Sequence, residues 1–213
     1  NASSTNSTAI GPSAFADGTN ALALGTDSNA SSTNSTAIGP SATASGPYST
    51  AIGPSATSSG YFSSASGSYS TALGNNSSAS GFYANASATN STAIGTYANA
   101  AASKATAIGV EALAGATNAL ALGTSSCASS TNGTAIGSNA TASGYEDGTA
   151  IGSNATASGY YNAIALGTNS TASGVSNPIA LGTNSTASNT NSTAIGSNAA
   201  ASGEYSTSLG FSA

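Results

Sequence analysis

The stretch STAIGPSATASG at residues 35–46 contains two A-x-G triplets that start seven positions apart. The triplets are Ala37-Ile38-Gly39 and Ala44-Ser45-Gly46, and the next one along the chain is Ala51-Ile52-Gly53. Their middle residue alternates between large and small, so the full phrase repeats every fourteen residues. Self-similarity at a short fixed period indicates a repeat architecture in which each phrase packs against the next one.

The repeating phrase predicts strands rather than helices. Gly and Ser fill the intervals between apolar residues, and the charged positions of a coiled coil are absent. Short runs such as Leu22-Ala23-Leu24 and Ile164-Ala165-Leu166 alternate with a period of two. The residues that flank the central Ala therefore share one face of a strand, and the Ala points to the other face. Each phrase is then strand, turn, strand, turn, and successive phrases stack as coils of a parallel β-solenoid whose interior fits Ala, Ser and Gly.

Composition excludes several classes of function. The 213 residues include one Lys or Arg, six Asp or Glu, one Cys and no His, Trp or Met, which gives a net charge of −5. So few titratable groups leave little material for acid–base, nucleophilic or metal chemistry, and we expect no enzyme activity and no cofactor. A single Lys cannot displace the counterions of a nucleic acid. No long apolar run is present, so we expect no membrane contact by this segment.

The phrase S-T-A-I-G-x-x-A-x-A-S-G resembles the YadA-like head repeats of trimeric autotransporter adhesins. The N-S-V-A-I-G signature of that family is matched by Asn34–Gly39 and by Asn191–Gly196, with Thr in place of Val. The resemblance covers essentially the whole chain. It implies an all-β, left-handed parallel β-roll with about fourteen residues per coil, in which three parallel chains surround one axis. It also implies a surface-exposed head that attaches to matrix, cells or solid surfaces.

An apolar residue recurs after most of the central alanines and faces away from the predicted interior. A repeating apolar column along one side of a solenoid is typical of an association surface. We therefore predict that this column forms the interface of a homotrimer. The predicted interface residues are Ile10, Leu24, Ile38, Ile52, Ile94, Ile108, Ile136, Ile151, Leu166, Leu181 and Ile195. The twenty-one-residue spacing around Leu73 places that residue on the other half of its coil.

Aromatic residues follow the triplets closely, so we expect them to line one edge of the solenoid. Two interpretations remain open: stacked rings that brace adjacent coils, or a surface strip for sugars or apolar surfaces. The strip would comprise Tyr48, Tyr61, Phe62, Tyr69, Phe82, Tyr83, Tyr145, Tyr160, Tyr161 and Tyr205. Phe15 lies beside Ala16 within a predicted strand, and we expect its ring to pack inward.

Other residue patterns carry weaker expectations. N-x-S/T motifs are frequent, and Asn and Ser also favour turns, so glycosylation and turn preference are both open. The candidate glycosylation sites are Asn6, Asn34, Asn90, Asn139, Asn154, Asn169, Asn184 and Asn191. Cys127 is interpreted as a small turn filler, and the Glu146-Asp147-Gly148 turn as a solvated loop rather than a cation site. We expect the one-residue insertions in YEDGT, YYNAI and VSNPI to bulge from the turns without moving the triplets.

Two main classes of function remain. One is adhesion, in which a rod with many copies of a weak contact binds an unidentified surface, matrix protein or glycan through avidity. The other is a purely architectural fibre or spacer. Ice binding through the threonines that precede the central alanines is disfavoured, because they share a face with the predicted interface. We expect residues 1–213 to form a single β-solenoid domain, a segment of a longer fibrous protein that lies outside the cell or at its surface and continues end to end.

Overall fold

The computed structural model describes all 213 residues, and every regular element in it is a short β-strand. The strands group into two compact units, Asn1–Lys104 and Ala105–Ala213, and each unit is described separately. The prediction that residues 1–213 form one domain stays a prediction.

Unit 1 contains two parallel sheets whose strands alternate along the chain. The odd-numbered strands have three residues each: β1 (Thr8–Ile10), β3 (Leu22–Leu24), β5 (Thr36–Ile38), β7 (Thr50–Ile52), β9 (Ser64–Ser66), β11 (Ser78–Ser80) and β13 (Thr92–Ile94). The even-numbered strands have two residues each: β2 (Phe15–Ala16), β4 (Asn29–Ala30), β6 (Thr43–Ala44), β8 (Thr57–Ser58), β10 (Thr71–Ala72), β12 (Asn85–Ala86) and β14 (Asn99–Ala100).

Unit 2 repeats the same arrangement. Its odd-numbered strands are β15 (Thr106–Ile108), β17 (Leu120–Leu122), β19 (Thr134–Ile136), β21 (Thr149–Ile151), β23 (Ile164–Leu166), β25 (Ile179–Leu181), β27 (Thr193–Ile195) and β29 (Thr207–Leu209). Its even-numbered strands are β16 (Leu113–Ala114), β18 (Cys127–Ala128), β20 (Thr141–Ala142), β22 (Thr156–Ala157), β24 (Thr171–Ala172), β26 (Thr186–Ala187) and β28 (Ala200–Ala201).

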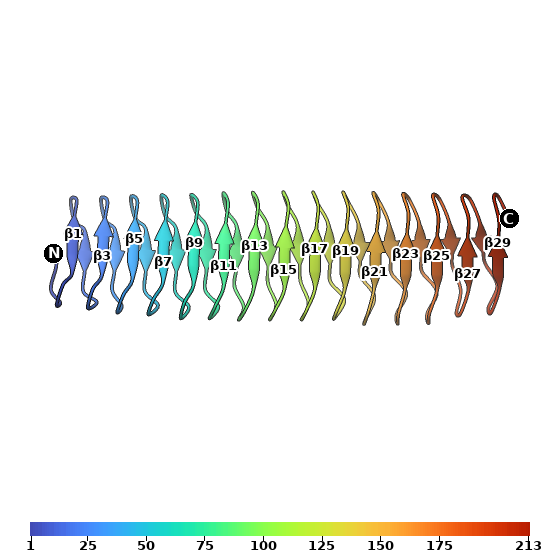
Figure 1. Cartoon of the computed structure of the whole chain (residues 1–213), viewed down its shortest axis with the longest axis horizontal. Helices are drawn as coiled ribbons and strands as arrows, with labels where there is room; N and C mark the ends of the chain where they lie inside the picture. Colours follow the sequence, from blue (N-terminus) through green and yellow to red (C-terminus); the bar gives the residue numbers. More distant parts are fainter. The chain divides into compact units, whose positions relative to one another are not determined.

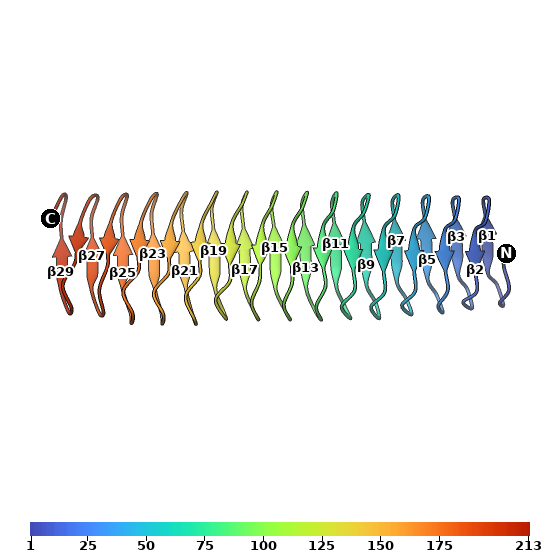
Figure 2. The ribbon, with the colours of Figure 1, turned by 180° about the vertical axis from the view of Figure 1, so that it is seen from behind.

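Each coil places one odd-numbered and one even-numbered strand on opposite sides of a thin interior. Within unit 1, Ala37 pairs with Ala23 on one side and with Ala51 on the other, so equivalent residues of successive coils are in register. Successive coils lie next to one another within each unit (Figure 1), and β2 lies against β1 and β3 when unit 1 is seen from behind (Figure 2). The predicted parallel β-solenoid of about fourteen residues per coil is confirmed.

The interior consists of alanine and serine. The central alanine of an odd-numbered strand, such as Ala37 or Ala51, has no exposed surface. The alanine that ends an even-numbered strand, such as Ala44, has none either. Buried serines use their hydroxyls within the turns: Ser35 donates to the carbonyl oxygen of Ser32 at 2.6 Å, and Ser170 donates to that of Gly167 at 2.8 Å. Small side chains are required here because the two backbones of a coil approach closely.

Positive φ angles explain why Asn and Gly recur in the turns. Asn34 in one turn has a φ of 55°, in the left-handed region that Asn tolerates better than most residues. Gly39 follows β5 with a φ of 127°, and a Cβ there would lie 2.7 Å from the carbonyl carbon of Gly53 in the next coil. The glycine of the A-I-G triplet is therefore required by both conformation and space.

The one-residue insertions leave the strands in register, as predicted. Ala135 pairs with Ala150 even though the intervening coil has fifteen residues. The prediction that the extra residues simply bulge is wrong, because Glu146 forms parallel bridges with Thr131 and Tyr161. The third insertion has Pro178 at a fully buried position. The inserted residues are thus part of the backbone ladder.

Candidate interaction surfaces

The odd-numbered strands present an apolar surface to solvent. Their central alanines point inward, and the residue that follows each alanine points outward. We call these outward residues the isoleucine column. In unit 1 they are Ile10, Leu24, Ile38, Ile52 and Ile94, and in unit 2 they are Ile108, Leu122, Ile136, Ile151, Leu166, Leu181, Ile195 and Leu209. Several are well exposed, for example Ile10 at 56% and Ile52 at 42%. Every predicted interface residue lies in this column.

The predicted interface omits two members of the column. Leu122 and Leu209 were left out, although each is the middle residue of its triplet and they pair with Ile136 and Ile195. In unit 1 the outward residues of β9 and β11 are serines, and Ser66 pairs with Ile52. Leu73 follows β10 instead and is exposed beside the other sheet, as its sequence spacing indicates.

The aromatic residues lie on two turn edges, so the prediction of a single strip along one edge is wrong. In unit 1, Tyr48, Tyr61 and Phe62 occupy turns that follow even-numbered strands, whereas Tyr69, Phe82, Tyr83 and Tyr97 follow odd-numbered strands. In unit 2, Tyr145, Tyr160, Tyr161 and Tyr205 follow even-numbered strands. The spacing around Leu73 shifts the phrase by half a coil, which moves the second group of unit 1 to the other edge.

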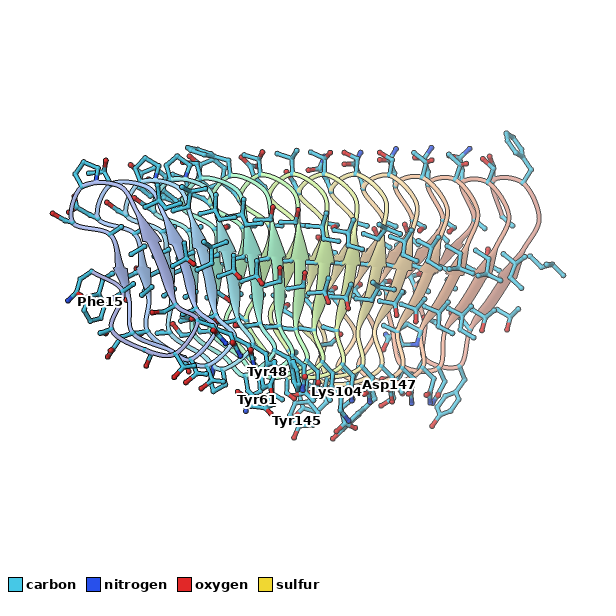
Figure 3. The ribbon with its side chains drawn as sticks, turned by 60° about the vertical axis from the view of Figure 1, so that its left-hand side comes forward. Phe15, Tyr48, Tyr61, Lys104, Tyr145 and Asp147 are labelled. Atoms are coloured by element: carbon cyan, nitrogen blue, oxygen red, sulfur yellow. The ribbon has the colours of Figure 1, made fainter.

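Within each group, rings from successive coils contact one another. Tyr69 stacks on Tyr83 with ring centroids 4.8 Å apart, and Tyr145 stacks on Tyr160 at 5.0 Å. Tyr48 and Tyr61 pack edge to face at 5.7 Å, and their side chains point away from the ribbon (Figure 3). Stacking between coils is what the bracing interpretation requires, and the exposed ring faces leave a role in binding open.

The Tyr161 hydroxyl has a raised pKa. Partial desolvation by the surrounding side chains contributes most, and the negative charges of Tyr160, Tyr145 and Glu146 would further disfavour its phenolate. The hydroxyl therefore stays protonated above the pH at which an ordinary tyrosine ionises.

Two individual predictions are wrong. Phe15 occupies the outward position of β2, because its neighbour Ala16 is the buried residue, and its ring lies outside the ribbon (Figure 3). Cys127 is the first residue of β18 rather than part of a turn; it pairs with Leu113 and Thr141 on the outward face. In a two-residue strand the alanine fixes the inward direction, so the residue before it must point out.

All eight candidate glycosylation asparagines have left-handed backbone conformations in turns. Several form ladders of side-chain amides along the coils. Asn154 donates to Asn169 at 3.2 Å, and Asn169 donates to Asn184 at 3.1 Å. The turns thus explain the frequency of Asn through backbone geometry and amide pairing, independently of any glycan.

The structure holds no pocket and no group of three or more His, Cys, Asp and Glu side chains. In the Glu146–Gly148 turn, the carboxylate of Asp147 accepts a hydrogen bond from the Asn132 side chain at 3.1 Å. None of the elements is a helix of the length and apolarity needed to cross a membrane.

Short parallel strands stacked around an alanine interior define the class of β-solenoid repeat proteins. The family model of the YadA head domain repeat matches this chain at residues 2–28, 30–56, 53–77, 74–98, 100–126, 128–145, 146–161, 161–176, 179–199 and 187–213. The chain belongs to this family, which confirms the family predicted from the repeated phrase. The family is one of surface-exposed adhesin heads and is not enzymatic. A search of curated proteins finds no match.

Proposed function

We propose that the chain is part of an adhesive head outside the cell or at its surface, in which three parallel copies of a left-handed roll associate through the isoleucine column. The observation that carries this proposal is the exposure of that column in a chain that belongs to the YadA head family. Isolated apolar residues are common on protein surfaces, but a column repeated in most of the coils, interrupted only at β9 and β11, is typical of an association surface.

A trimer would also explain how so thin a solenoid becomes stable. The interior is almost entirely alanine and serine, which contribute little apolar area. Complete burial of a Leu or Ile side chain stabilises a protein by about 1.5–3 kcal/mol. Association around an axis would add this contribution in successive coils without changing the interior.

Mutation of the column tests the assembly. The double variant Ile38→Asp/Ile52→Asp introduces two charges in adjacent paired strands, where a trimer would bury them unpaired. The control Thr43→Asp/Thr57→Asp introduces the same two charges on paired residues of the other sheet. Light scattering should show a monomer for the first variant and a trimer for the control and the unmodified chain. A trimer in all three proteins would exclude the isoleucine column as the interface.

The adhesive role requires a separate test. The unmodified chain and the Ile38→Asp/Ile52→Asp variant are applied to immobilised matrix proteins and glycans. Saturable binding that weakens at least tenfold on loss of the trimer supports adhesion through avidity. If neither protein binds any of the surfaces, the result supports the alternative of an architectural fibre or spacer.

We propose that only some of the turn asparagines are glycosylated. Asn154, Asn169 and Asn184 lie in successive coils, where equivalent residues are about 4.8 Å apart. That spacing leaves no room for glycans on adjacent coils. Glycopeptide mapping of the secreted chain by mass spectrometry should find glycans on non-adjacent coils only. No glycan at any of the eight asparagines would refute the modification.

A further inference from the structure

In unit 2, the strands β20, β22, β24 and β26 and the residue that follows each of them carry two regular columns of hydroxyl groups. Thr141, Thr156, Thr171 and Thr186 form one column and pair with one another in parallel register. The residue two positions after each threonine forms the other column. These residues are Ser143, Ser158, Ser173 and Ser188. We call the eight residues the hydroxyl face.

The hydroxyl face is free to contact solvent or a solid. Its threonines are half-buried and its serines are exposed. The side-chain hydrogen bonds of this unit involve other residues: for example, the Asn169 amide donates to the Asn184 side chain, and the Ser170 hydroxyl donates to the Gly167 carbonyl oxygen. None of them uses a hydroxyl of the hydroxyl face. The face also lies on the side of the interior opposite the isoleucine column, so trimer formation through that column would leave it uncovered.

The spacing of the face is set by the β-ladder. Equivalent residues of adjacent coils are about 4.8 Å apart, and residues two positions apart in a strand are about 6.6 Å apart. In a tetrahedral network of water with hydrogen bonds of about 2.8 Å, second neighbours are about 4.5 Å apart and the hexagonal repeat is about 7.4 Å. The two lattices agree within about a tenth in each direction, a difference that rotation about χ1 can accommodate.

The chemistry of the face also suits ordered water. Each threonine offers a hydroxyl that can replace a water of the network and a methyl group beside it. All acids of unit 2, namely Glu111, Glu146, Asp147 and Glu204, lie outside the named strands, so no charge on these strands orients water around itself. The strands are held in register by backbone hydrogen bonds on both sides. The array therefore keeps its spacing without further ordering on binding.

From this lattice match we infer that the hydroxyl face of unit 2 binds ice. The function is independent of the adhesive role, because it uses the opposite face and a different ligand.

Thermal hysteresis and ice recrystallisation inhibition measure this activity on the full chain in its assembled form. The variant Thr156→Leu/Thr171→Leu replaces two adjacent hydroxyls, and Leu113 already occupies this column in β16, so the fold accommodates the change. The control Thr134→Leu/Thr149→Leu adds the same bulk on the other sheet, where Leu120 occupies the equivalent position. Circular dichroism melting confirms that both variants fold.

The unmodified chain should separate the melting and freezing points and inhibit recrystallisation. The Thr156→Leu/Thr171→Leu variant should lose at least nine-tenths of the hysteresis, and the control should keep it. Absence of both activities in the folded unmodified chain would overturn the inference, as would full hysteresis in the variant. If the variant does not fold, uptake of the fluorescently labelled unmodified chain into a growing ice hemisphere decides the question, since exclusion from the ice would overturn the inference.

Discussion

Two glycines of one coil, Gly109 and Gly115, should respond in opposite ways to the same added methyl group. Gly109 has a φ of 136°, and a Cβ there would lie 2.4 Å from the carbonyl oxygen of Gly123 in the next coil. Gly115 is exposed, its φ is outside the left-handed region, and the nearest atom to a Cβ would be 4.0 Å away. The pair therefore separates the demands of the turn from the general effect of replacing glycine.

The expected magnitudes follow from these environments. An L-residue held at such a φ costs on the order of 1–3 kcal/mol. The contact with Gly123 adds to this cost, because the neighbouring atom is backbone and cannot rotate away. Gly109→Ala should thus destabilise the chain by at least about 3 kcal/mol, a large effect for a single substitution. Gly115→Ala should be neutral or stabilise by up to about 1 kcal/mol, because alanine restricts the unfolded chain.

Thermal unfolding followed by circular dichroism measures the difference, with all proteins at the same concentration so that any contribution of association is equal. Gly109→Ala should melt well below the unmodified chain, and Gly115→Ala at or slightly above it. Equal melting temperatures for the two variants would show that the backbone geometry of the A-x-G turn does not require glycine at position 109. The explanation of the repeat by backbone conformation would then be wrong.

Two further predictions concern the insertions. Deletion of Asp147 should destabilise the chain by about 1–3 kcal/mol in chemical denaturation, because Glu146 would lose its bridges to Thr131 and Tyr161. The control Asp147→Asn should be nearly neutral. An unchanged denaturation midpoint for the deletion would show that the extra residue is only a bulge. The pKa of Tyr161 is raised in the folded chain, so the contribution of this side chain to stability is complete below about pH 10, the ordinary pKa of tyrosine. The contribution is lost as the pH rises through the folded pKa. Tyr161→Phe should therefore reduce the fall in melting temperature between about pH 9 and 11, and an unchanged fall would contradict the raised pKa of Tyr161.

The solenoid and its inward and outward faces could be predicted because the sequence repeats the same physical constraint in every coil. A small residue at the centre of T-A-I can only point inward, so the direction of Ile38 followed from its neighbour Ala37. The same rule applied to Phe15 beside Ala16 gives the correct outward direction, whereas we expected the ring to pack inward. The interior excludes a ring of that size, so alternation is a better guide than hydrophobicity here.

The edges of the solenoid were harder to predict because they depend on counting half-coils. The shift around Leu73 moves Tyr69 to the opposite edge from Tyr48, although both lie two positions after a glycine. The role of the inserted residues could not be predicted either. Glu146 bridges Thr131 of the preceding coil, which has no insertion, and Tyr161 of the next insertion supplies a second bridge. Such pairing between consecutive insertions is not visible in one phrase alone.

The same half-coil shift has a consequence for assembly. Ser66 of β9 and Ser80 of β11 occupy the column positions, so two coils of unit 1 offer hydroxyls where the neighbouring coils offer Ile52 and Ile94. Each missing side chain removes about 1.5–3 kcal/mol of potential burial per chain. A trimer built on the isoleucine column would therefore be held on both sides of this segment and least strongly within it. Ser66→Ile and Ser80→Ile would join Ile52 to Ile94 in one uninterrupted column and should strengthen the association through the same contacts that Ile38→Asp and Ile52→Asp disrupt.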